Sequence, residues 1–199
     1  MEISRMGKFA RDNLQNSIDA FFNLDEKLFD EVEEVEDTVN FLNHSITNQL
    51  VRLRALDLSP KDLNKLSMMT LAVADIERIS DHAENIVEYA EQVRSKKATL
   101  SQIAIDELKQ LSAAVMQSID LSLSIFADEK FELIDQAELL EQKVDDMQKL
   151  IVQNHVDRLM DSKCDPLGGV VFTDMSSDLE RCSDHAINIA CALSDNPDY

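Results

Sequence analysis

A twelve-residue polar motif occurs twice in this chain. Asp75–Ile86 reads Asp-Ile-Glu-Arg-Ile-Ser-Asp-His-Ala-Glu-Asn-Ile, and Asp178–Ile189 reads Asp-Leu-Glu-Arg-Cys-Ser-Asp-His-Ala-Ile-Asn-Ile; nine of the twelve positions are identical. If core packing alone kept the two segments alike, the apolar positions would match and the charged ones would differ. Here the charged and polar positions persist, and this indicates a chemical task that both copies share.

Carboxylates four residues apart are the most chemical feature of each copy. On a helix Glu77 and Asp81 lie one turn apart on one face, and Glu180 and Asp184 do the same. Two like charges at this spacing cost roughly 0.2–0.5 kcal/mol, so their repetition predicts a compensating positive charge. That charge is a metal ion, a salt-bridged arginine or a basic partner. The alternative interpretation is an ordinary solvated face opposite the apolar side of the helix.

Further carboxylates lie on the long segment that precedes each motif. If that segment packs antiparallel against the motif, several carboxylates in each half converge on one cation, and oxygen ligands suit Mg, Ca, Mn or Fe. Asn40 stands where the second half has Asp145, so we expect the first site to be poorer in carboxylates. The candidate metal ligands are Glu33, Glu36, Asp37, Glu77, Asp81, Glu141, Asp145, Glu180 and Asp184.

The arginine and histidine of each motif have structural interpretations. Asp75 and Arg78 are spaced for a helix salt bridge; alternatively the arginine reaches a glutamate on the preceding helix. His82 and His185 project about 100° away from the preceding aspartate, and we expect them to hydrogen-bond a neighbouring helix. The run Ser-Asp-His cannot form a catalytic triad, because consecutive helical residues point in different directions. No other catalytic motif is present, so the sequence predicts a protein that is not an enzyme.

These motifs need helices to position them. Apolar residues recur at alternating spacings of three and four, which is typical of helix bundles, and the second half matches the first at offsets of 105 and then 103 residues. Ser59 followed by Pro60 marks a helix start, and residues 163–169 are expected to form a loop. We predict an all-α fold of six helices, made of two tandem three-helix bundles at residues 1–97 and 98–199.

Composition limits the partners. The 199 residues include 19 Lys and Arg against 39 Asp and Glu, a formal net charge of -20. This predicts that neither nucleic acid nor an anionic membrane surface binds the chain as a whole. No apolar run is long enough to cross a membrane. Cys164, Cys182 and Cys191 have no zinc-like spacing and are interpreted as reduced thiols of a cytoplasmic protein.

The duplicated motif, at the end of each three-helix unit, resembles that of the PhoU family of phosphate-uptake regulators over about Ile3 to Leu193. The resemblance implies two tandem three-helix bundles with surface metal sites, often for iron or zinc, at the paired Glu/Asp-x-x-x-Asp motifs. Carried over to this chain, it points to Glu77, Asp81, Glu180 and Asp184, and more loosely to Glu33 or Glu36, Asp37, Glu141 and Asp145.

A narrower similarity concerns the start of the chain. Residues 3–10 and the acidic stretch 25–37 are similar to the cytosolic PhoU-like region of bacterial Na/phosphate cotransporters. This implies a regulatory domain of phosphate transport at the inner face of the plasma membrane, joined to a membrane transporter in cis or in trans. The alternative is a free-standing PhoU-type regulator that links a phosphate transporter to a sensor kinase. A homodimer is left open, and a metal-dependent hydrolase is a further alternative.

Overall fold

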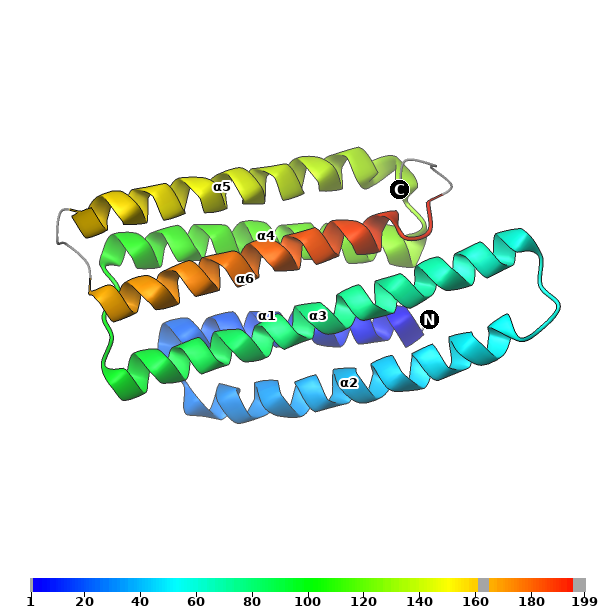
Figure 1. Ribbon diagram of the computed structural model, residues 1–199, viewed down its shortest axis with the longest axis horizontal. Coiled ribbons are helices and arrows are strands. Elements are labelled where there is room, and N and C mark those ends of the chain that lie inside the picture. The colour runs from blue at the N-terminus through cyan, green and yellow to red at the C-terminus, as the bar shows by residue number, and fades with distance from the viewer. Residues whose placement is uncertain (1, 161–164, 195–199) are drawn as a thin grey trace.

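The described residues form a bundle of long α-helices with no β-strand among them (Figure 1). The computed structural model describes residues 2–160 and 165–194. The predicted all-α fold with three helices in each half is confirmed. The helices are α1 (Glu2–Asn23), α2 (Glu26–Arg54), α3 (Pro60–Lys96), α4 (Gln102–Asp128), α5 (Ile134–Met160) and α6 (Pro166–Cys191), with a 3-10 turn, η1 (Phe131–Leu133), before α5.

The two halves repeat each other beyond the motif. Leu24 and Glu129 end α1 and α4, and both adopt left-handed backbone angles, with φ of 51° and 54°. Because these residues are 105 positions apart, the offset that relates α2 to α5 also relates α1 to α4. Lys97, which ends α3 in the same left-handed conformation, lies at the predicted boundary between the repeats. The boundary itself stays a prediction.

The two helices that carry the motif, α3 and α6, begin in the same way, with a capping side chain followed by proline. Ser59 caps α3 by accepting a hydrogen bond from the Asp62 amide at 3.2 Å, and Pro60 follows it. Asp165 caps α6 by accepting from the Gly168 amide at 3.3 Å, with Pro166 next. The predicted loop over residues 163–169 was therefore wrong in its second half, because a capping side chain and a proline start the helix early. Cys164 lies outside the described residues.

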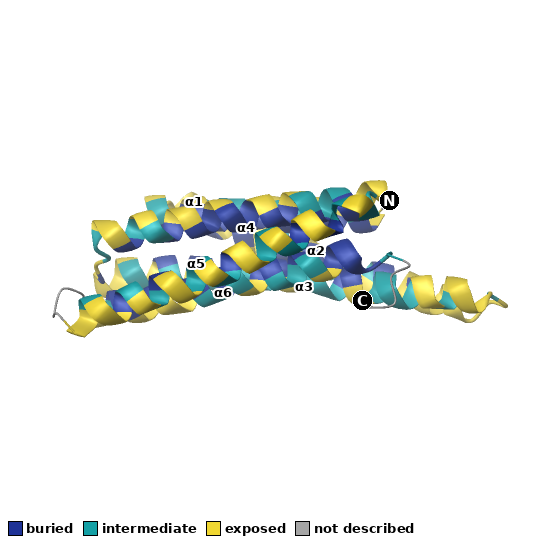
Figure 2. Ribbon diagram, turned by 90° about the horizontal axis from the view of Figure 1, so that it is seen from above, coloured by how far each residue is buried: buried dark blue, intermediate teal, exposed yellow. Residues whose placement is uncertain are grey.

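The two halves share one core. In it α3 packs against α1, α2 and α6, while α6 packs against α4, α5 and α3. Residues from all six helices join a single buried cluster, including Met6, Ile76, Leu111 and Leu179, and each buried aliphatic side chain contributes about 1.5–3 kcal/mol. Cys182 and Cys191 are buried free thiols. The buried faces of the helices turn inward along most of the bundle (Figure 2).

Candidate functional site

Two His–Asp pairs join the halves across the contact between α3 and α6. His185 donates a hydrogen bond through Nδ1 to Asp75 Oδ1 at 2.8 Å. His82 Nδ1 lies 3.2 Å from Asp178 Oδ1, although its ring is not aligned for a hydrogen bond. The histidine of each repeat thus meets the aspartate of the other, as a pseudo-two-fold axis requires. The expected hydrogen bond to a neighbouring helix is thus formed by His185, whereas His82 lies beside its aspartate without one.

The two imidazoles stack on each other at that axis. Their ring centroids are 5.8 Å apart and their planes differ by 24°. His82 and His185 therefore form one unit with their aspartate partners, and this unit fixes the register of α3 against α6. The contact between the repeats therefore explains why both copies of the motif have their first aspartate and their histidine.

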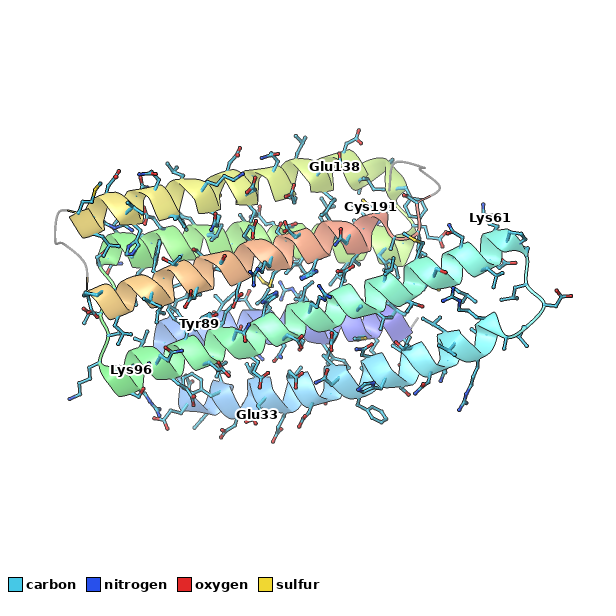
Figure 3. All side chains as sticks on the ribbon, viewed as in Figure 1. Glu33, Lys61, Tyr89, Lys96, Glu138 and Cys191 are labelled. Atoms are coloured by element: carbon cyan, nitrogen blue, oxygen red, sulfur yellow. The ribbon has the colours of Figure 1, made fainter. Side chains whose placement is uncertain are left out.

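Asp178 is held more firmly than its counterpart Asp75. It is only 4% exposed, and it accepts hydrogen bonds from the Tyr89 hydroxyl at 2.7 Å and from the Asn85 amide at 3.2 Å. Tyr89 lies on the side of α3 that faces α6 (Figure 3). Burial alone would raise the pKa of Asp178, but His82, Tyr89 and Asn85 together hold it below its usual value.

A groove of about 620 Å³ opens over the stacked histidines. Its charged lining comes equally from the two repeats: Arg78 and Asp81 from α3, Arg181 and Asp184 from α6. Arg181 also lies 3.8 Å from Asp178, the i, i+3 contact that the sequence suggested. The second carboxylate of each Glu-x-x-x-Asp pair therefore lines the groove, between two exposed arginines.

The first carboxylate cluster lies between α2 and α3. Burial, followed by the negative charges of Glu84, Asp81, Asp37 and Glu77, raises the pKa of Glu36 to about 7. Glu36 is 8% exposed, and the Asn40 amide donates a hydrogen bond to it. These neighbours bring four of the predicted ligands together and add Glu84, which the sequence did not single out.

Glu33 lies nearer the start of α2 than Glu36 does, and its negative charge contributes to the raised pKa of Glu84. Glu84 also has a raised pKa, caused first by burial and then by Glu88 and Asp81. It makes up for the carboxylate that Asn40 replaces, because the equivalent position in the second repeat is Ile187. Asn40 alone therefore does not make the first cluster poorer in carboxylates than the second.

The second cluster lies between α5 and α6 and contains Glu141, Asp145, Glu180 and Asp184. Burial raises the pKa of Glu141, and the charges of Asp184 and Asp145 raise it further. Burial also comes first for Glu180 and for Asp184, whose pKa values are both raised. Lys149 contacts Asp145 at 2.5 Å, and its positive charge opposes the rise in the pKa of Glu141. Figure 3 shows Glu33 and Glu138 on α2 and α5, at opposite edges of the bundle.

The donor chemistry of both clusters suits a cation, because carboxylates with raised pKa values are stabilised when a positive charge arrives. As the side chains stand, no three His, Cys, Asp or Glu residues among residues 2–160 and 165–194 are close enough to hold one metal ion. The predicted ligands are thus gathered by the fold into two groups, but they do not form a closed coordination shell.

Comparison with known proteins follows the repeat that the structure displays. A family model described as "PhoU domain" matches residues 3–90 and, again, residues 108–193. The chain belongs to the PhoU domain family. The two matched segments begin 105 residues apart and end 103 residues apart, the same offsets that relate the helices.

Curated relatives and solved structures agree with the family. A "Phosphate-specific transport system accessory protein PhoU homolog" of Xylella fastidiosa is 25% identical over 189 residues, covering 95% of this chain and 78% of that protein. A homologue from Thermotoga maritima is 24% identical, covering 94% and 81%. The crystal structure of PhoU from Pseudomonas aeruginosa has a TM-score of 0.89 at 23% identity, covering 96% and 91%. The PhoU regulatory protein from Streptococcus pneumoniae has a TM-score of 0.85 at 17% identity, covering 96% and 89%. At these identities, the structures establish the fold.

Proposed function

We propose that this chain is a PhoU-type accessory protein that regulates phosphate transport and catalyses no reaction. The observation that carries the proposal is the match of the PhoU family to both repeats, with the polar motif in each. The named relatives are accessory proteins of a phosphate-specific transport system. They support a regulator over the metal-dependent hydrolase that the sequence left open.

The same relatives support a free-standing regulator better than a domain of a Na/phosphate cotransporter. Each is named as an accessory protein, and the chain covers about four fifths of their length. None of the described helices combines the length and apolar character needed to cross a bilayer. We propose that the chain acts at the cytoplasmic face of a phosphate transporter, with that transporter and a sensor kinase as its protein partners.

The groove on the pseudo-two-fold axis is the surface that we assign to partner recognition. It combines Arg78 and Arg181 with Asp81 and Asp184, so a partner with alternating charges can pair with it. Charged side chains carried by two packed helices favour specific recognition, because a mismatched partner leaves them unpaired. The His–Asp pairs beneath the groove keep the four side chains in register.

We further propose that each carboxylate cluster of the partner-free protein binds a divalent cation, such as iron or zinc. The side chains of Glu36 and Asp81 supply oxygen ligands in the first cluster, and that of Glu141 does so in the second. A cation favours the ionised form of Glu36, whose pKa of about 7 in the free protein leaves it partly protonated at neutral pH. Binding should therefore release protons, more at pH 6.5 than at pH 8.5.

Cation binding is tested by isothermal titration of Mn²⁺ into the protein in two buffers of different ionisation enthalpy. Mn²⁺ is a suitable probe because it prefers oxygen ligands. We expect binding with proton release, and weaker binding in the Glu36→Gln variant. Glu34→Gln, at an exposed position on the same helix, is the matched control. Absence of heat in the wild type, or equal affinity in Glu36→Gln and wild type, contradicts cation binding but leaves the regulatory function standing.

The regulatory function is tested by phosphate uptake. The chain is expressed in a bacterium from which its own PhoU homologue has been deleted, and uptake of labelled phosphate is followed at low and at high external phosphate. We expect expression to restore the dependence of uptake on external phosphate. A folded, expressed chain that leaves uptake unchanged contradicts the proposal.

A further inference from the structure

The hairpin end between α2 and α3 leaves an unusual amount of apolar surface uncovered. Residues 51–69, here called the α2–α3 tip, include nine apolar residues, yet none of the nineteen is buried. Val51, Leu53 and Leu56 are 59%, 44% and 58% exposed. The tip extends past the rest of the bundle at the end where the N-terminus lies (Figures 1 and 2).

The second repeat secures its corresponding helix ends with polar contacts to the rest of the bundle. At the place of Leu53, α5 has Arg158, which forms a two-pronged ion pair with Glu107 on α4, at 3.1 and 2.7 Å. Asp165, at the start of α6, accepts a hydrogen bond from the Thr99 amide at 2.9 Å. Exposed apolar side chains occur at both ends, since Val156, Leu159 and Met160 of α5 are 42%, 41% and 73% exposed.

Charge sets the tip apart from the remainder of the molecule. Residues 51–69 contain four Lys and Arg residues against two Asp residues, a net charge of +2, so the other 180 residues carry -22. The equivalent stretch of the second repeat, residues 156–172, has two basic and three acidic residues. Arg52 and Arg54 flank the exposed leucine on α2 and are themselves exposed.

We propose that the α2–α3 tip docks on the surface of an anionic lipid bilayer. A convex end that presents aliphatic side chains among arginines matches the interface of such a membrane, where apolar groups enter between headgroups and basic groups meet lipid phosphates. The charge of -22 on the other residues repels the same surface, so the molecule can approach it only tip first. The net charge of the chain argues against membrane binding; the distribution of that charge allows it at this one end.

A protein partner is the less favoured occupant. Binding energy at protein interfaces is concentrated in tryptophan, tyrosine and arginine anchors that fill pockets. The tip has no aromatic residue, and its aliphatic groups stand on a convex end. A fluid bilayer needs no complementary pocket to accept Val51, Leu53 and Leu56.

The test is flotation with lipid vesicles in EDTA, so that divalent cations do not bridge the acidic body to the lipid. We expect the wild type to float with vesicles made of equal parts phosphatidylglycerol and phosphatidylcholine, and to stay unbound with phosphatidylcholine alone. Arg52→Glu with Arg54→Glu should weaken binding by about tenfold or more. Leu53→Ser with Leu56→Ser should weaken it to a similar extent, since each aliphatic group loses its burial in the membrane.

The matched control is Leu139→Ser with Leu150→Ser. These leucines are 72% and 60% exposed on α5, so the variant removes more exposed apolar surface than the tip variant does, far from the tip, and should bind as the wild type does. All four altered positions are exposed, and circular dichroism should give unchanged unfolding temperatures. Failure of the wild type to float, or equal flotation of the tip variants, overturns the proposal. If the tip instead binds an acidic protein, the wild type will fail to float.

A single fluorophore locates the contact independently. The chain has no tryptophan, so Leu56→Trp places one probe at the tip and Leu150→Trp places one on α5. We expect the emission of Leu56→Trp to shift to shorter wavelength on phosphatidylglycerol vesicles, and that of Leu150→Trp to stay unchanged. Flotation without a shift at Leu56→Trp would mean that another surface binds the lipid, and would overturn the proposal.

Discussion

Asp75 and Asp178 hold the same position in the two repeats, but they are stabilised by different numbers of partners. Asp75 accepts one hydrogen bond, from His185. Asp178 is buried beside His82 and accepts two hydrogen bonds, from Tyr89 and Asn85. The second repeat has Ala192 at the place of Tyr89. Duplication has thus preserved the backbone plan and the polar motif, while the residues that support the motif have diverged.

The two hairpin ends differ in the same way. Gly168 at the start of α6 lies against the backbone of the segment between the repeats, whereas its counterpart Lys65 is exposed. Equivalent positions therefore contribute differently to the free energy of unfolding, because they have different neighbours in the folded chain.

Removing the two motif aspartates should expose the largest difference. Asp178→Ala is expected to lower the free energy of unfolding by about 3 kcal/mol, because Tyr89 and Asn85 lose a buried acceptor and His82 loses its charge partner. Asp75→Ala should cost about 1 kcal/mol. Urea unfolding at pH 7 measures both. Equal losses would contradict the difference that we assign to Tyr89 and Asn85.

The pH dependence of the same variant gives a second check. The pKa of Asp178 is lowered in the folded state. Its ionised form therefore stabilises the fold fully above the unfolded pKa of about 3.8, and that contribution is lost as the pH falls through the lower folded value. The gap between wild type and Asp178→Ala should stay constant from pH 5 to pH 7 and narrow below pH 4, once the protonated side chain loses its charge-assisted bonds.

The hairpin ends provide the next largest contrast. A Cβ added at Gly168 would lie 2.1 Å from the Thr99 carbonyl oxygen, so the backbone has to move, and Gly168→Ala should cost about 2 kcal/mol. Lys65→Ala at the equivalent position should change stability by less than about 0.5 kcal/mol, since it removes only an exposed ion pair with Glu129. Thermal unfolding of the two variants measures the contrast, and similar changes in both would refute it.

The carboxylate clusters differ less, and in a pH-dependent way. The folded pKa of Glu36 is about 7, above its unfolded value, so Glu36 reduces stability as the pH rises from about 4.5 through 7. Glu36→Gln should therefore raise the free energy of unfolding at pH 8 by about 3 kcal/mol and change it little at pH 4.5. Urea unfolding at the two pH values measures this.

Glu141→Gln is the paired variant in the second cluster. The pKa of Glu141 is raised too, but Lys149 opposes the shift. We expect the same sign with a smaller size. If Glu141→Gln raises the free energy of unfolding at pH 8 by as much as Glu36→Gln does, Lys149 and Glu84 do not distinguish the clusters.

Local sequence signals predicted the helices and their duplication well. Alternating apolar spacing and the Ser59–Pro60 start are properties of the residues concerned, so they can be recognised without tertiary structure. The pairing of Asp75 with His185 could not be predicted, because it depends on how α3 crosses α6. The repeat carried a usable signal: an aspartate and a histidine kept at the same spacing in both copies.

The clusters were predicted in part. The spacing of Glu77 and Asp81 correctly indicated a shared face, and Glu36 and Asp37 joined them because α2 packs against α3. Glu84 was not predicted because it has no counterpart in the second repeat, so repetition of the motif gives no signal for it. Gly168 was placed in a loop because glycine favours turns, whereas the close approach of the Thr99 carbonyl requires it at the start of a helix.

The central claim is that the motif has two tasks: its first Asp and its His hold the repeats together, and its second Asp serves regulation. Phosphate uptake by Asp81→Asn with Asp184→Asn, in the strain that lacks its own PhoU homologue, tests this most directly. Asp30→Asn with Asp146→Asn, at exposed positions on α2 and α5, is the matched control. We expect the control to restore phosphate-dependent uptake, and the motif variant to fold with an unfolding temperature no lower than that of the wild type and to fail to restore uptake. Full restoration by the motif variant would contradict the claim.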